Sequence, residues 1–256
     1  MTPNEIISDP FAVFALSVVV LWISVRIGAF LHTRWNLEES EHEDFGVILA
    51  ATLTLLGLII GFSFSMAVSR YDQRKNYEEE EANAIGTEYV RSDLLPAADA
   101  ARIRALLKNY LDQRVLFYQS RDERQLRQVD IDTAQLQTEL WSAVRAPSTA
   151  QPTAVSALAA SGMNDVLNSQ GYTQAAWRNR IPVAAWGLMA AIAICCNVML
   201  GYGTRGARWR APLPLIMPFV VSISFLLIAD IDSPRGGLIR VNPQNLLSLS
   251  QSLQAH

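Results

Sequence analysis

The sequence predicts an all-α membrane protein with four spanning helices and a soluble helical domain between the second and third. Half of the 256 residues are hydrophobic, yet the middle of the chain is long and polar. Four segments with no charged residue, or with only one, are each long enough to cross a bilayer as a helix. The polar middle shows helical spacing of its apolar residues and no strand pattern. These observations together define the class.

The four predicted spans divide the chain into four parts. We expect spans over residues 11–31, 47–68, 181–202 and 211–229. The corresponding parts are a first hairpin (1–68), a soluble helical domain (69–180), a second hairpin (181–229) and a tail (230–256).

This topology places both termini and the soluble domain on one side of the membrane. Basic residues near the membrane are more numerous on that side, which favours a cytoplasmic location in a cell (inner) membrane. They are Arg70, Arg74, Lys75, Arg178, Arg180, Arg235 and Arg240, against Arg34, Arg205, Arg208 and Arg210 on the other side.

The second span is predicted to continue beyond the membrane as one unbroken helix. Residues 47–68 contain no charge, whereas the following residues are polar and rich in helix formers. No proline occurs between Pro10 and Pro96, so nothing forces the helix to stop at the membrane surface.

One face of this helix combines bulky apolar side chains with small or polar ones. Gly57 and Gly61 beside it form a pair of small residues four positions apart, which lets another backbone approach closely. The stripe is either a packing seam in a helix bundle or a pore lining in which Leu58 and Phe62 form an apolar constriction. Its members, at three- and four-residue spacing, are Thr54, Leu58, Phe62, Ser65, Ser69 and Asp72.

A resemblance to a known family rests on two segments. The first, FSFSMAVSRYDQRKNYEEEEANAIG, resembles the second membrane helix of the bestrophin family and its cytosolic continuation. In that family an aromatic ends the narrow neck and an aromatic-flanked arginine follows about two turns later. Matching Arg70 and Tyr71 to that arginine places Phe62 on the neck aromatic, with Leu58 and Thr54 above it.

The second segment, IADIDSPRGGLIRVNPQNL, is similar to the family's acidic segment after the last span, and the chain resembles the bacterial bestrophin-like membrane proteins. It contains Asp230, Asp232, Pro234 and Gly236. Animal bestrophins use acidic residues in this area to bind calcium, but here Arg235 and Arg240 stand among the acids, so calcium gating is not expected to carry over. The resemblance implies an oligomeric ion channel, with five subunits as in bestrophins.

The acidic residues favour cation conduction. A ring of subunits would gather the loop before the second span around the outer mouth, and Asp72 would add charge at the inner end. The predicted outer-mouth acids are Glu38, Glu39, Glu41, Glu43 and Asp44. The alternative is a membrane-anchored helical scaffold or sensor that binds a cytosolic partner without ion flux.

No residue pattern indicates an enzyme, a cofactor, a metal site or a nucleic-acid partner. The three histidines are scattered, and no nucleophile–base pair stands out. Four consecutive carboxylates over 78–81 point all round a helix and are interpreted as solvated charge. Cys195 and Cys196 are interpreted as buried thiols, and Asn197 is expected to bond across helices.

Overall fold

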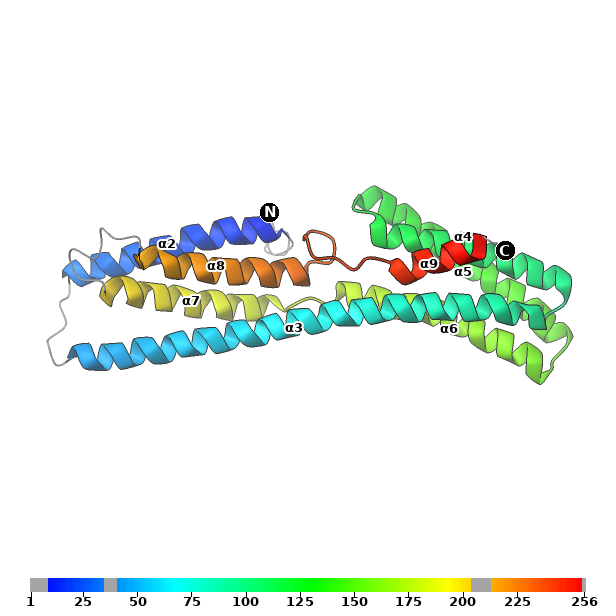
Figure 1. Cartoon of the computed structure of the whole chain (residues 1–256), viewed down its shortest axis with the longest axis horizontal. Helices are drawn as coiled ribbons and strands as arrows, with labels where there is room; N and C mark the ends of the chain where they lie inside the picture. The colour runs from blue at the N-terminus through cyan, green and yellow to red at the C-terminus, as the bar shows by residue number, and fades with distance from the viewer. Residues whose placement is uncertain (1–8, 35–40, 204–212, 255–256) are drawn as a thin grey trace. The chain divides into compact units, whose positions relative to one another are not determined.

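The computed structural model describes residues 9–34, 41–203 and 213–254, and every regular element within these ranges is helical (Figure 1). The all-α prediction is therefore confirmed. The helices are α2 (Pro10–Arg34), α3 (Glu41–Arg91), a short 3-10 turn η1 (Ser92–Leu94), α4 (Ala97–Gln119), α5 (Glu123–Ala150), α6 (Ala154–Arg178), α7 (Val183–Gly203), α8 (Leu213–Asp232) and α9 (Gln244–Gln254).

The chain divides into two compact units, and α3 contributes to both. The first, called the span unit below, comprises Met1–Tyr71 and Arg180–Arg240. The second, called the helical unit, comprises Asp72–Asn179 and Val241–His256. Residues 230–240 of the predicted tail thus belong with the spans, and α9 belongs with the helical unit.

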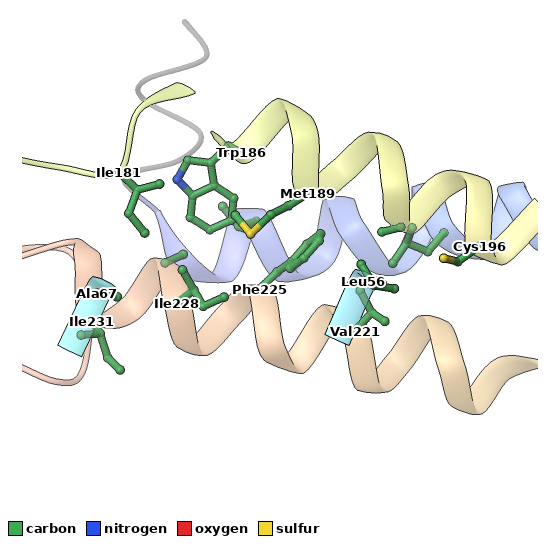
Figure 2. Packing of buried hydrophobic residues seen from close by; sticks show 14 residues of the cluster. Leu56, Ala67, Ile181, Trp186, Met189, Cys196, Val221, Phe225, Ile228 and Ile231 are labelled. Atoms are coloured by element: carbon green, nitrogen blue, oxygen red, sulfur yellow. The ribbon is translucent and has the colours of Figure 1, made fainter. Parts of the chain in front are cut away.

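The span unit holds the helices that are long and apolar enough to cross a membrane, namely α2, α7, α8 and the first part of α3. Within it α2 lies beside α7 and α8 (Figure 1). Figure 2 shows Trp186 and Met189 of α7 reaching toward Phe225 of α8. The Trp186 and Phe225 rings meet edge to face, with their centroids 6.1 Å apart and their planes at 83°. Such burial of aromatic rings stabilises the bundle.

Two glycines make a close backbone contact between helices in this unit. A Cβ on Gly28 of α2 would overlap the carbonyl oxygen of Val198, and a Cβ on Gly201 of α7 would overlap that of Val25. The α2 and α7 backbones therefore touch directly, as small residues allow in membrane helices.

The predicted continuity of the second span is confirmed, because α3 is a single helix of 51 residues. At ~1.5 Å per residue it is about 76 Å long. One face of it is buried from Leu56 onward, through Leu56, Ser63 and Ala67 in the span unit and Arg74 and Ile85 in the helical unit.

In the helical unit, α4 buries the apolar face that its spacing predicts, including Ile103, Leu107 and Tyr110. Pro147 does not end α5, because the helix continues to Ala150. Leu140, Val144 and Pro147 are all buried at helical spacing, so packing outweighs the cost of an interior proline.

Candidate functional site: the exposed stripe of helix α3

The stripe predicted on the second span is uncovered in the single chain. Leu58 is 52% exposed and Phe62 is 64% exposed, although both are large and apolar. Thr54, Ser65 and Ser69 are exposed as well, and Asp72 follows on the same helix face and is also exposed. The residues that pack inside the chain lie on the other side of α3. The stripe is therefore not a packing seam within one subunit.

Gly57 and Gly61 are likewise unused inside the chain. Nothing lies within 4 Å of the position that a Cβ would take on either residue. A close helix approach at this pair stays a prediction for contacts between copies. Within the chain that role falls to Gly28 and Gly201, which sequence spacing did not single out because they lie on helices far apart in the chain.

The arginine–tyrosine pair of the family motif ties α3 to the segment after α8. The guanidinium of Arg70 lies 3.4 Å from the carboxylate of Asp232, which is only 2% exposed. The Tyr71 hydroxyl donates to the carbonyl oxygen of Arg240 at 3.4 Å. The backbone N–H of Ile181, just before α7, donates to both oxygens of Asp232 at 3.2 and 3.0 Å. Asp232 thus joins three segments at one point.

Asp230 holds the following loop in a tight fold. Its two carboxylate oxygens accept from the backbone N–H groups of Leu238 at 2.7 Å and Ile239 at 2.9 Å. A side chain at Gly237 would collide with Asp230, so glycine is needed at this point. Both acids of the segment are thus occupied by the chain itself. Buried Pro234 and exposed Gly236 lie in the turn that follows Asp232.

The predicted outer-mouth acids are only partly described. Glu38 and Glu39 lie outside the described residues, and Glu41 begins α3 but its side chain is not described. Glu43 and Asp44 are exposed in the first turns of α3. There they also favour the helix itself, because negative charge near a helix N-terminus complements its dipole.

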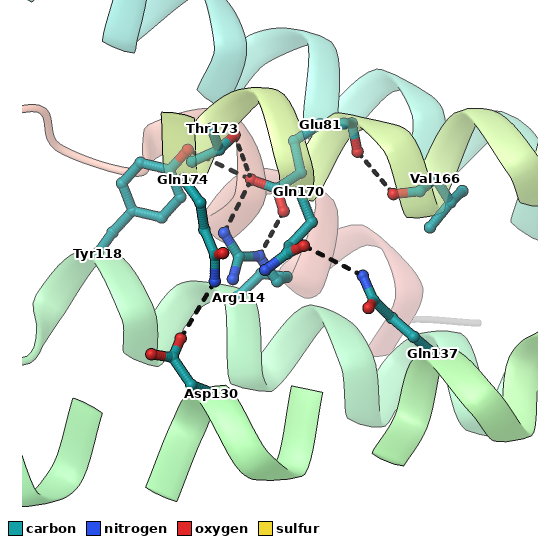
Figure 3. A network of polar contacts seen from close by, with 10 residues as sticks. Glu81, Arg114, Tyr118, Asp130, Gln137, Val166, Gln170, Thr173 and Gln174 are labelled. Atoms are coloured by element: carbon teal, nitrogen blue, oxygen red, sulfur yellow. Dashed lines mark hydrogen bonds and ion pairs between the residues drawn. The ribbon is translucent and has the colours of Figure 1, made fainter. Parts of the chain in front are cut away.

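The interpretation of residues 78–81 as solvated charge is wrong for Glu78 and Glu81, which are 1% and 0% exposed. Glu81 forms a buried ion pair with Arg114 (Figure 3). The same carboxylate accepts from the Tyr118 hydroxyl at 3.3 Å and from the Thr173 hydroxyl at 3.2 Å. Burial raises the pKa of Tyr118 well above its usual value and Glu81 adds to this, so the hydroxyl stays protonated and donates.

Two further charged residues of α3 satisfy the ends of other helices. Glu78 accepts from the Leu246 N–H at 3.0 Å and from the Asn245 side chain at 2.7 Å, which caps the first turn of α9. Arg74 donates to the carbonyl oxygens of Ala176 and Asn179, where α6 ends. The charges on this face therefore join α3 to α4, α6 and α9.

Two smaller expectations are corrected. Cys196 is buried, but Cys195 lies on a different face of α7 and is exposed. The Asn197 side chain donates within its own helix, to the carbonyl oxygen of Ala193 at 2.8 Å, rather than across helices. No group of three or more potential metal ligands from His, Cys, Asp and Glu occurs among the described residues.

The fold and the uncovered helix define a four-span α-helical membrane protein, and comparison with known proteins gives its family. A sequence model described as the bestrophin-like domain matches residues 11–246. The chain belongs to the bestrophin-like family, which confirms the resemblance found in its sequence. No curated protein matched the chain in a sequence comparison.

Solved structures agree with this fold. A bacterial bestrophin homologue from Klebsiella pneumoniae is similar with a TM-score of 0.65 and 14% identity, over 95% of this chain and 96% of that one. A point variant of the Klebsiella pneumoniae homologue gives a TM-score of 0.63 at 15% identity, over 96% and 98% of the two chains. At this identity the likeness establishes the fold alone.

Proposed function

We propose that the protein is an oligomeric ion channel whose narrowest part is an apolar neck formed by α3. The observation that carries the proposal is the exposure of Leu58 and Phe62 on the same face of α3 as exposed Thr54 and Ser65. Apolar side chains left uncovered in the chain must face lipid or other copies. Small and hydroxyl-bearing neighbours on the same face favour a shared aqueous path over lipid.

The neck would act as a barrier to hydrated ions. Rings of Leu58 and Phe62, with Thr54 above them, would surround the axis, and an apolar constriction of this kind gates by excluding water. Ser65, Ser69 and Asp72 would follow below it and offer oxygen atoms that replace part of an ion's hydration shell.

We infer a preference for cations from the charges near the path. Exposed Glu43 and Asp44 at the start of α3, and exposed Asp72 further along it, would raise the local cation concentration. Glu38, Glu39 and Glu41 belong to the same acidic stretch of sequence. We further propose five subunits, on the likeness to the bestrophin family. The distribution of basic residues supports a cell (inner) membrane location with the helical unit in the cytoplasm.

A membrane-anchored scaffold or sensor is the second candidate. The observation that favours it is the helical unit, in which an interior ion pair and two helix caps organise α3, α4, α6 and α9 without reference to a pore. In that case the stripe on α3 would be an oligomer contact or a lipid-facing surface.

Ion flux through the purified protein in liposomes separates the two candidates. Under a potassium chloride gradient we expect a conductance that reverses near the potassium equilibrium potential. Replacing Glu43 and Asp44 by glutamine and asparagine should shift the reversal potential toward zero. No flux from an intact oligomer would support the scaffold. Reversal near the chloride equilibrium potential would show that Glu43 and Asp44 do not face the ion path.

A further inference from the structure

A pocket of about 290 Å³ lies in the span unit, between α2 and α7, with Phe225 of α8 in its wall. Five residues between Val13 and Leu21 line it on α2, and five residues between Val183 and Ile194 line it on α7. All of these residues belong to one compact unit. None of its lining residues takes part in the hydrogen bonds and ion pairs of α3 described above.

The wall of this pocket offers almost nothing to a polar ligand. It contains no charged side chain, and the Ser17 hydroxyl already donates to the carbonyl oxygen of Phe14 at 2.9 Å. Water needs two or more polar partners to stay in a cavity. An apolar cavity of ~150 Å³ stays dry and binds benzene, so a larger one can hold more hydrocarbon.

The pocket is elongated along the helices and open to the surface of the bundle. Its lining covers about 12 Å of α2 and about 16 Å of α7 at ~1.5 Å per residue. Leu16 and Val183 on its rim are each 50% exposed. Gly187 leaves space, since nothing lies within 4 Å of the position of its missing Cβ.

We propose that this pocket binds one acyl chain of a membrane phospholipid. The surface around it belongs to helices that are apolar enough to cross a membrane, so the molecules that reach its rim are lipid tails. A slot that is apolar, dry and parallel to the helices fits such a chain. Filling it restores dispersion contacts that an empty void would lose. The proposal does not depend on channel activity.

Trp186 supplies a direct test, because its ring lines the pocket while only 7% of the residue is exposed. The full chain is reconstituted in vesicles of phosphatidylcholine with bromine on its acyl chains, which quenches tryptophan emission on contact. The Trp186 emission is the difference between the wild type and Trp186→Phe, which keeps an aromatic wall and removes one of six tryptophans. We expect most of this emission to be lost.

Gly187→Leu places a side chain in the slot and should restore the emission of Trp186. Ala184→Leu is the matched control, since it adds a leucine to an exposed position of α7 outside the pocket and should leave the quenching unchanged. Ala190→Leu blocks the slot from another point of the same helix if Gly187→Leu fails to fold.

Three results would overturn the proposal. Trp186 emission that is unquenched in the folded wild type would mean that the slot is empty or covered by another copy. Quenching that survives a folded blocking variant would place the lipid elsewhere. Quenching by a brominated free fatty acid in unlabelled vesicles, but not by the labelled phospholipid, would assign the slot to the free acid.

Discussion

At the scale of single residues, a substitution of Phe62 distinguishes a pore lining from a packing surface. Phe62→Ala should raise ion flux several-fold, because removing one ring of large side chains widens the neck and admits water. Single-subunit stability should change little, since the side chain is 64% exposed. The measurement is flux in liposomes together with a thermal melt.

Phe64→Ala is the matched control, because Phe64 is also exposed, at 41%, but points away from the stripe. It should leave the flux unchanged. If Phe62 is instead buried between copies, its loss would act as in a protein core, where Phe→Ala costs ~3–5 kcal/mol. Unchanged flux with a clearly lower melting temperature would return the stripe to packing.

We expect Glu88 to make the stability of the protein depend on pH. It is 0% exposed, and neither carboxylate oxygen has a hydrogen-bond partner among the described residues. Burial raises the pKa of its carboxyl from 4.5 to about 8; Arg91 opposes the shift and Asp165 adds to it. The folded state therefore binds the proton more tightly than the unfolded state. Its stabilising contribution is full below pH 4.5 and is lost as pH rises to about 8.

The melting temperature should accordingly fall between pH 5 and pH 8 more steeply in the wild type than in Glu88→Gln, which cannot ionise. Glu80→Gln changes an exposed glutamate of the same helix and should keep the wild-type slope. Parallel profiles for the wild type and Glu88→Gln would show that Glu88 is not the titrating group.

At the scale of helices, the contact between α2 and α7 depends on the absence of a side chain at Gly201. Gly201→Ala should lower the free energy of unfolding by ~1–3 kcal/mol, because the new methyl group meets the Val25 carbonyl and the backbones must separate. Gly187→Ala on the same helix has open space and gains helix propensity, so it should be neutral or slightly stabilising. Thermal melts that fall equally for both variants would contradict this contact.

Helix α3 shows how far the sequence predicts this fold. Its span and its unbroken continuation follow from composition and from the missing proline. The burial of Glu78 and Glu81 does not follow from the sequence, because a glutamate normally indicates a solvent-exposed position. Their positions around the helix do indicate burial, since both residues continue the buried face that begins at Leu56 and Ala67. Only their partners on other helices, such as Arg114, required the structure.

The other contacts that the sequence did not predict share a physical cause. They join segments that are distant in the chain, and the spacing of residues within one segment does not reveal such contacts. Gly57 and Gly61 have the spacing of a close helix contact, yet Gly28 and Gly201 make the one seen within the chain. Asp232 is another case, because its role depends on Arg70 and on the backbone before α7. The sequence pattern located the candidate helix, and tertiary packing determines which of its faces stays uncovered.

At the scale of the whole molecule, the uncovered α3 argues for self-association. Only 6% of its most apolar stretch is buried in the chain, compared with 50% for α8. A helix with exposed glycines, hydroxyls and Asp72 on one face is a poor lipid-facing surface, so we expect copies to cover it. Native mass measurement in mild detergent should give a closed oligomer, at about five times the 28.3 kDa chain mass. A stable monomer would contradict the channel, because one copy cannot enclose a path, and a dimer would leave only the scaffold.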